Sequence, residues 1–137
     1  MRDDVFRFPE AVHRDPAVDA WLASRGEGLR ALVDDWFGHL RALGPDVREL
    51  MHDGCATACV EDVAFAHVGA YTAHVSLYFF RGAHLQDPTG LLEGKGKSGR
   101  HVKLGATLRL CDADARRRAL EALIDAAYRD ARRHVSR

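Results

Sequence analysis

The chain has 137 residues, of which 47% are hydrophobic and 29% charged, and this composition is typical of one soluble globular domain. Its formal net charge of zero removes the electrostatic argument for a nucleic-acid partner. No apolar run approaches the ~20 residues that a membrane-spanning helix needs, and the acidic N-terminus with its early proline is unlike a signal peptide.

The cysteines indicate the cellular compartment, and the distribution of charge indicates the kind of ligand that the chain could attract. The three cysteines form no CxxC pair, so we expect no disulfide framework, and a reducing cytoplasm fits best. Residues 1–70 carry 7 basic and 13 acidic groups, whereas residues 71–137 carry 13 and 7. We therefore expect one cytoplasmic domain over residues 1–137, with no nucleic-acid or membrane partner and with a second half able to attract an anion.

Helical spacing dominates the first part of the chain. Asp15 and Pro16 have the residue types of a helix N-cap and first turn, and they predict a short helix. Apolar residues at i, i+3, i+4 and i+7 predict a longer helix over about 29–43, which Gly44-Pro45 would end. The side chains that the short helix is expected to bury are Val18, Trp21 and Leu22.

In the middle of the chain the hydrophobic spacing falls to two residues, and it then returns to helical spacing near the end. Residues 63–69 and 73–80 are predicted strands joined by a turn around Ala70-Tyr71. Shorter candidate strands are 47–51, 57–61 and 100–104, with 107–110 as an extra edge strand. A last helix is expected over about 112–133, with a buried stripe of Leu120, Leu123, Ile124, Ala127 and Ala131. This order predicts an α+β fold, in which an antiparallel sheet of about five strands is covered by helices on one face.

The hairpin of residues 63–80 also predicts which side chains share a face. With an even loop centred on Ala70-Tyr71, His67 lies opposite His74, and a slip of one residue would exchange the two faces. The face under the helices then carries Ala64, Ala66, Val68, Val75, Leu77 and Phe79. The outer face carries Val63, Phe65, His67, His74, Ser76, Tyr78 and Phe80, to which the strand at 100–104 adds His101 and Lys103.

The stretch 81–103 holds the most informative residues for function. It contains five glycines and all three lysines of a chain that otherwise uses seventeen arginines. A loop of about twenty residues is long for a compact domain, and glycines with clustered cations favour an anion. We expect it to be ordered near the outer sheet face. The predicted ligand-binding residues are Lys95, Lys97, Arg100, Lys103 and Tyr78.

Three sequence features suggest a more specific site, for a nucleotide, a metal ion or a nucleophile, and each also has a simpler interpretation. Residues 94–99, GKGKSG, match the letters GxGxxG, but a strand follows where a dinucleotide site needs a helix, so a flexible turn with weak anion affinity is favoured. His67 and His74 are candidate ligands for a metal ion, iron or zinc, but no four-ligand motif accompanies them, and polar pairing on a sheet face is the alternative. Cys55, three residues after His52, is either a thiolate nucleophile or a buried, inert cysteine.

The string HVSLYFFRGAHLQDPTGLLEGKGKSGRHVKL, residues 74–104, resembles the YdhG-like family, a domain of unknown function related to frataxin-like and YjbR/CyaY-like proteins. The resemblance covers about residues 25–135. It implies a compact fold of helices packed on an antiparallel sheet. It also implies an iron-chaperone role, proposed for some members by analogy with frataxin, whose acidic ridge would correspond here to Asp34, Asp35, Asp46, Glu49 and Asp53.

These observations favour two functional hypotheses. The first is a small binding protein without catalytic activity, whose ligand is an anionic small molecule or a metal held near loop 81–100 and the outer sheet face. The second is a homodimeric interaction module without a small ligand, which would use the outer-face aromatics Phe65, Tyr78 and Phe80. The chain is accordingly expected to be a monomer or a homodimer, and an enzyme is the third hypothesis.

Overall fold

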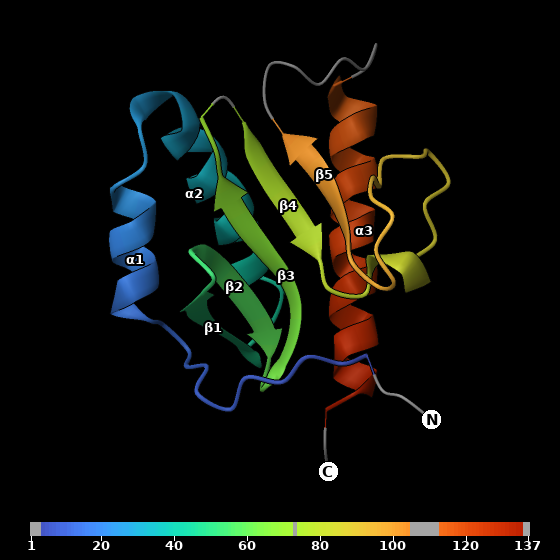
Figure 1. The fold of residues 1–137 in the computed structure, drawn as a ribbon, viewed down its shortest axis with the longest axis horizontal. Helices are drawn as coiled ribbons and strands as arrows, with labels where there is room; N and C mark the ends of the chain where they lie inside the picture. Colours follow the sequence, from blue (N-terminus) through green and yellow to red (C-terminus); the bar gives the residue numbers. More distant parts are fainter. Residues whose placement is uncertain (1–3, 73, 105–112, 136–137) are drawn as a thin grey trace.

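The computed structural model describes residues 4–72, 74–104 and 113–135, which form an α+β fold (Figure 1). The elements are α1 (Pro16–Ala23), α2 (Glu27–Arg41), β1 (Val47–His52), β2 (Cys55–Val60), β3 (Val63–Ala70), β4 (Val75–Phe79), a 3₁₀ turn (Gly82–His84), β5 (Arg100–Leu104) and α3 (Ala113–Arg133). The predicted fold class is therefore confirmed. The extra strand expected at 107–110 lies outside the described residues.

The five strands form a single antiparallel sheet in the order β1-β2-β3-β4-β5, so each strand pairs with the next along the chain. The three helices lie on one face of this sheet (Figure 1), as predicted. Between them and the sheet lies the main hydrophobic core, in which Phe37 of α2, Leu77 of β4 and Ile124 of α3 are fully buried.

The helices form where capping residues and apolar spacing predict them. Asp15 is the N-cap of α1, and its carboxylate accepts a hydrogen bond from the Ala17 backbone N–H (2.9 Å). Val18 and Leu22 are buried as expected. Trp21 is only half-buried: it packs against the core, and the Arg25 guanidinium lies over its ring (4.5 Å). The predicted stripe of α3 is buried in full. No helix among the described residues is both long and apolar enough to cross a bilayer.

The register of the β3–β4 hairpin differs from the prediction by four residues. The Tyr71 N–H donates to the His74 carbonyl (2.8 Å), so β3 continues to Ala70 and β4 begins at Val75. His67 consequently lies opposite Tyr78, and the predicted cross-strand pairing of His67 with His74 is wrong. A shift by an even number of residues does not by itself exchange the faces of the hairpin, so Leu77 and Phe79 remain under the helices.

A β-bulge in β3 changes the predicted face of three residues. Ala66 pairs with Ala58 and Ala64 with Cys59, which leaves Phe65 without a partner in β2. Val63 and Phe65, expected on the outer face, therefore lie in the core under the helices. Ala64, expected under the helices, packs instead in a second, smaller cluster on the outer face, together with Leu50, Cys59, Phe80 and Ala11.

The N-terminal segment, residues 4–14, crosses the sheet on the side away from the helices (Figure 1). Its backbone is hydrogen-bonded to the sheet at two places. The Ala64 N–H donates to the Phe6 carbonyl (2.9 Å), and further along Val12 and Glu49 exchange two backbone hydrogen bonds (3.0 and 2.7 Å). The Phe6 and Phe8 rings pack against Phe80, 5.4 and 6.4 Å away between ring centroids. This segment covers part of the outer face and leaves the surface around Tyr78 open.

Candidate functional site

Two adjoining hollows open on the outer sheet face, where loop 81–99 lies beside β4 and β5. The first, here called the loop hollow, has a volume of about 510 Å³ and lies between the glycines of the loop, Lys97, Ser98 and the N-terminal Phe6. The second, the strand hollow, has a volume of about 210 Å³ and is lined by residues of β3, β4, β5 and the β3–β4 connection. Tyr78 and His101 line both hollows. Together the hollows have the size of a small-molecule site.

Strand register brings the side chains of the strand hollow together. His101 of β5 lies opposite Tyr78 of β4, and Lys103 lies opposite Ser76. Because alternate residues of a strand share a face, these four side chains lie on the outer face, as predicted. His67 and His74 also line this hollow, although they are not cross-strand partners.

Loop 81–99 lies near the outer face, as expected, and its own hydrogen bonds hold it there. The Asp87 carboxylate accepts from the Leu91 and Leu92 N–H groups (2.9 and 2.8 Å), which closes the tip of the loop. Further along, Glu93 exchanges two backbone hydrogen bonds with His101 (2.8 and 2.9 Å), so the loop pairs with the edge strand β5. At its end, Gly99 lies against Tyr78 so closely that a Cβ atom at this position would overlap the tyrosine hydroxyl.

The predicted ligand-binding residues separate into two groups. Lys97 lines the loop hollow, Lys103 the strand hollow, and Tyr78 both. Lys95 is exposed and lines neither hollow. Arg100 also lines neither, because its guanidinium donates to the carbonyls of the loop itself, at Gly96 and Gly99 (2.6 Å each). Arg100 therefore holds the shape of the loop.

His67 is held in a largely apolar environment at the base of the strand hollow. Its ring stacks on Tyr78 (4.6 Å between centroids, 20°) and meets the edge of Phe80 (5.5 Å). The Nδ1 atom is buried and has no hydrogen-bond partner in the part of the chain that the structure describes. Burial, assisted by the nearby His52, lowers the pKa of His67 to about 4, so the ring is neutral at pH 7.

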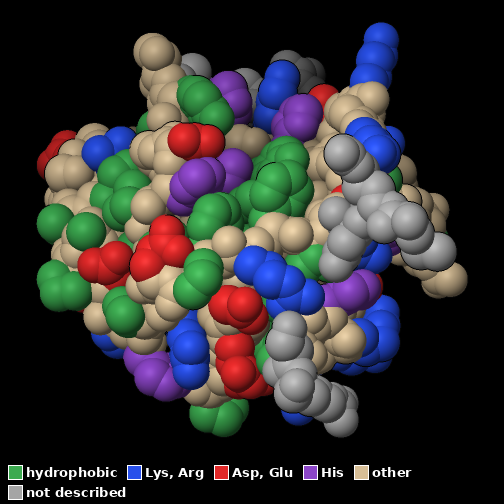
Figure 2. Space-filling view, turned by 60° about the horizontal axis from the view of Figure 1, so that its bottom comes forward, with side chains coloured by type: hydrophobic (Ala, Val, Ile, Leu, Met, Phe, Trp, Pro, Cys, Tyr) green, Lys and Arg blue, Asp and Glu red, His purple; other side chains and the backbone are tan. Residues whose placement is uncertain are grey.

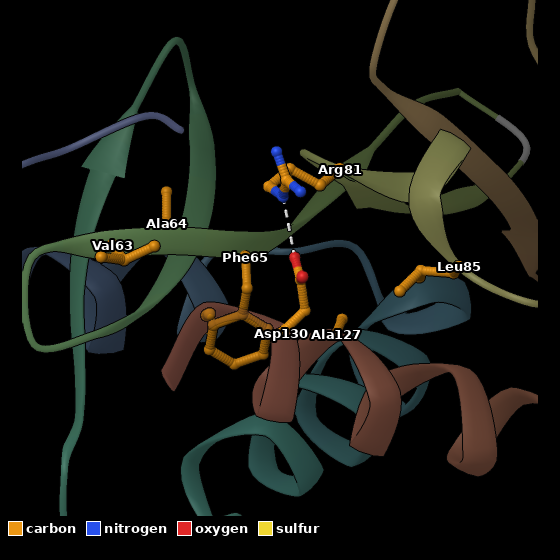
Figure 3. Close-up of a pocket in the computed structure, with 8 residues that line it drawn as sticks. Val63, Ala64, Phe65, Arg81, Leu85, Ala127 and Asp130 are labelled. Atoms are coloured by element: carbon orange, nitrogen blue, oxygen red, sulfur yellow. Dashed lines mark hydrogen bonds and ion pairs between the residues drawn. The ribbon is translucent and has the colours of Figure 1, made fainter. Parts of the chain in front are cut away.

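A network of charged residues lies behind the loop hollow and was not predicted from the sequence. The Asp4 carboxylate accepts from Ser98 (2.8 Å), is 2.7 Å from Nε2 of His84, and pairs with Arg81. Arg81 in turn donates to Asp130 of α3 (2.8 Å), the contact drawn as a dashed line in Figure 3. Burial alone would raise the pKa of Asp4, but the hydrogen bonds of His84 and Ser98 and the charge of Arg81 outweigh it and lower that pKa.

The void beside this network is too small for a ligand. Apolar side chains surround it, among them Phe65, Leu85 and Ala127 (Figure 3), and its volume is about 10 Å³, close to the minimum for one water molecule. The charged network beside the void therefore connects the N-terminal segment, the loop and α3.

Asp4, Phe6 and Ser98 line the loop hollow and were not predicted as site residues from the sequence. The alternation of Phe6 and Phe8 was the one local sign that the N-terminal segment packs as an extended chain.

The metal hypothesis finds little support in the geometry. Within residues 4–72, 74–104 and 113–135, no three or more His, Cys, Asp or Glu side chains come together in a way that could hold a metal ion. The five acidic residues that the family resemblance nominates each have a partner: Asp34 with Arg30, Asp35 with Arg117, Asp46 with Tyr128, Glu49 with Arg41 and Asp53 with His52. His67, His74 and His101 all line the strand hollow, but among the described residues these side chains do not form a group that could hold a metal ion.

The two cysteines that the structure describes do not form a nucleophilic site either. Cys55 and Cys59 are both buried free thiols. Burial raises the pKa of Cys55, and it raises the pKa of Cys59 to about 12, so both remain protonated at neutral pH. The interpretation of Cys55 as an inert, buried residue therefore agrees with the structure.

Comparisons of the chain with protein-family models, with curated proteins and with solved structures find no match. The resemblance to the YdhG-like family therefore rests on the string at residues 74–104. In the structure this string contains β4, the loop and β5, and it supplies most of the residues that line the two hollows.

The surface proposed for a homodimer is smaller than the sequence indicates. Of its three aromatic side chains, Phe65 lies in the core and Phe80 is 6% exposed beneath Phe6 and Phe8, so that only Tyr78 is partly open to solvent. On the face turned forward in Figure 2, acidic, basic and histidine side chains are interspersed with hydrophobic ones. The face in that view has no large, continuous apolar patch of the kind that marks a stable interface.

Proposed function

We propose that this protein binds a small anionic ligand in the loop hollow and the strand hollow, without catalysing a reaction. The observation that carries the proposal is the presence of Lys97 in one hollow and Lys103 in the other. Neither lysine forms an ion pair with any residue that the structure describes. An anion entering either hollow would meet a cation that is not already neutralised.

The other charges around the hollows support an anionic ligand. Lys103 is the one lysine, arginine or carboxylate side chain among those that line the strand hollow. The loop hollow also contains Asp4, but that carboxylate already pairs with Arg81 and receives hydrogen bonds from the loop. The Tyr78 hydroxyl and the His101 ring supply hydrogen-bond donors at the boundary of the two hollows.

Two further parts of this proposal concern the origin and location of the protein. The string at residues 74–104 supports membership of the YdhG-like family. The free thiols Cys55 and Cys59 support a reducing compartment, the cytoplasm.

The proposal is tested by NMR titration with inorganic phosphate, pyrophosphate and simple carboxylates at low ionic strength. We expect saturable shifts confined to the amides around Tyr78, Lys97, His101 and Lys103, and weaker binding as salt is added, because salt screens charge attraction. Lys95→Ala is a matched control, since it removes the same charge from the same loop outside both hollows. If no anion produces saturable shifts at these amides, the proposed function is wrong.

A further inference from the structure

Building on the proposed function, we infer that the preferred ligand is a linear dianion. One anionic group binds Lys97 in the loop hollow, and the other binds Lys103 in the strand hollow. The inference depends on three features of the site. Each hollow has its own lysine, Tyr78 and His101 form the boundary between the hollows, and the contacts of these two residues hold that boundary in place.

The two lysines line different hollows. Lys103 belongs to β5 and shares the outer face with His101, two residues earlier, at a spacing of about 6.6 Å along the strand. Lys97 lies in the loop and lines the loop hollow, two residues before Gly99, which packs against Tyr78. A small ion such as phosphate, seated in one hollow, engages one lysine, whereas a ligand with an anionic group at each end engages both.

Tyr78 and His101 form the boundary that such a ligand must cross. They are cross-strand neighbours, and they are the two residues common to both hollows. The middle of the ligand would therefore lie along the tyrosine ring and the imidazole. An apolar chain of a few carbon atoms suits the ring faces, and the hydroxyl and ring nitrogen remain able to bond the anionic ends.

The boundary is fixed in position before any ligand arrives. The Tyr78 ring is stacked on His67 on one side and bounded by Gly99 on another, and the backbone of His101 is paired with Glu93 of the loop. A preformed wall lowers the ordering cost of binding. Because each hollow presents one lysine, we expect the site to select ligands by the distance between their anionic groups.

The inference is tested by isothermal titration calorimetry with straight-chain dicarboxylates, from succinate to pimelate, each compared with the monocarboxylate of the same carbon number. Because the second anionic group binds at a high effective concentration, we expect one chain length to bind at least about tenfold more tightly than its monocarboxylate. Lys97→Ala or Lys103→Ala should each remove that preference. Lys95→Ala, the matched control, should keep it.

The outcomes separate this inference from the proposed function. Equal affinities for dicarboxylates and monocarboxylates would overturn the dianion and leave anion binding intact. A preference for dicarboxylates that survives both Lys97→Ala and Lys103→Ala would also overturn it. If neither class of acid nor phosphate binds, the proposed function itself is wrong. All substituted lysines are exposed or line open hollows, and circular dichroism confirms that each variant is folded.

Discussion

At the scale of single residues, burial makes His67 depart strongly from the ordinary behaviour of a histidine. Its pKa of about 4 lies below the usual value of an unfolded histidine, about 6.5, so between these pH values the unfolded chain binds a proton that the folded protein does not. The free energy of unfolding should therefore fall as the pH is lowered from 6.5 to 4, by up to ~3 kcal/mol from this residue.

This prediction is checked by urea unfolding of wild type and His67→Gln at several pH values. The variant has no titrating group at this position, so its stability should decline less over that pH interval. His13→Gln, at an exposed site in the N-terminal segment, is the control and should follow the wild type. Parallel pH profiles for wild type and His67→Gln would contradict the neutral, buried state of His67.

Gly99 is the second residue whose role is specific. Because a Cβ atom there would overlap the Tyr78 hydroxyl, Gly99→Ala must displace the ring that forms the boundary of both hollows. We expect weaker anion binding and a loss of stability of about 1–3 kcal/mol from overpacking. At Gly96, in the same loop, a Cβ atom would be 3.8 Å from the Gly99 carbonyl oxygen, an ordinary contact, so Gly96→Ala should change both properties much less. Calorimetric titration and thermal unfolding of the two variants compare these effects directly.

At the scale of helices and strands, α2 contains a glycine that the fold does not require. Gly38 is exposed in the interior of the helix, and a Cβ atom there would meet no atom within 4 Å. Alanine has the higher helix propensity, so Gly38→Ala should stabilise the protein by about 0.5–1 kcal/mol. Gly44→Ala is the opposing case, because its Cβ atom would collide with Tyr128. Urea unfolding should show a higher midpoint for the first variant and a lower one for the second.

The elements and their faces were largely predictable from the sequence, whereas the register was not. Apolar spacing locates the helices and all five described strands, and the parity of the hairpin puts Tyr78, His101 and Lys103 on the outer face. The length of the β3–β4 connection depends on a single backbone hydrogen bond at Tyr71, which has no counterpart in the pattern of apolar residues. A bulge at Phe65 likewise leaves no trace in composition, although it moves a large aromatic side chain from one face to the other.

At the scale of the whole molecule, the opposite charges of the two halves of the sequence find a structural explanation. Residues 1–70 are net acidic and residues 71–137 net basic. Several contacts join one half to the other: Arg117 with Asp35, Arg132 with Asp46, and Arg81 with Asp4. Part of the asymmetry thus serves to hold α3 and the loop against the first half. The lysines of the loop and β5 have no ion-pair partner among the described residues, and they are the residues that we propose bind an anion.

The clearest contact between the two halves of the sequence is that of Asp4 with Arg81, His84 and Ser98. It joins the N-terminal segment to the loop across 77 to 94 residues of sequence. Asp4→Asn keeps the shape of the side chain but removes its charge. We expect a loss of about 1–3 kcal/mol at pH 7, the range for a charged hydrogen-bonded group that loses its partner. Faster amide exchange at Ala64, whose N–H donates to Phe6, would show that the segment has loosened.

The pH dependence of this loss distinguishes a charge effect from a change in packing. The pKa of Asp4 is lowered in the folded protein, so its contribution is complete above the unfolded carboxyl value of about 3.9 and disappears as the pH falls below it. Wild type and Asp4→Asn should therefore converge in stability at acid pH. Asp34→Asn, which removes an exposed pair with Arg30, should cost less than about 1 kcal/mol at any pH. A difference between wild type and Asp4→Asn that persists unchanged at pH 3 would mean that the carboxylate charge does not hold the N-terminal segment to the loop.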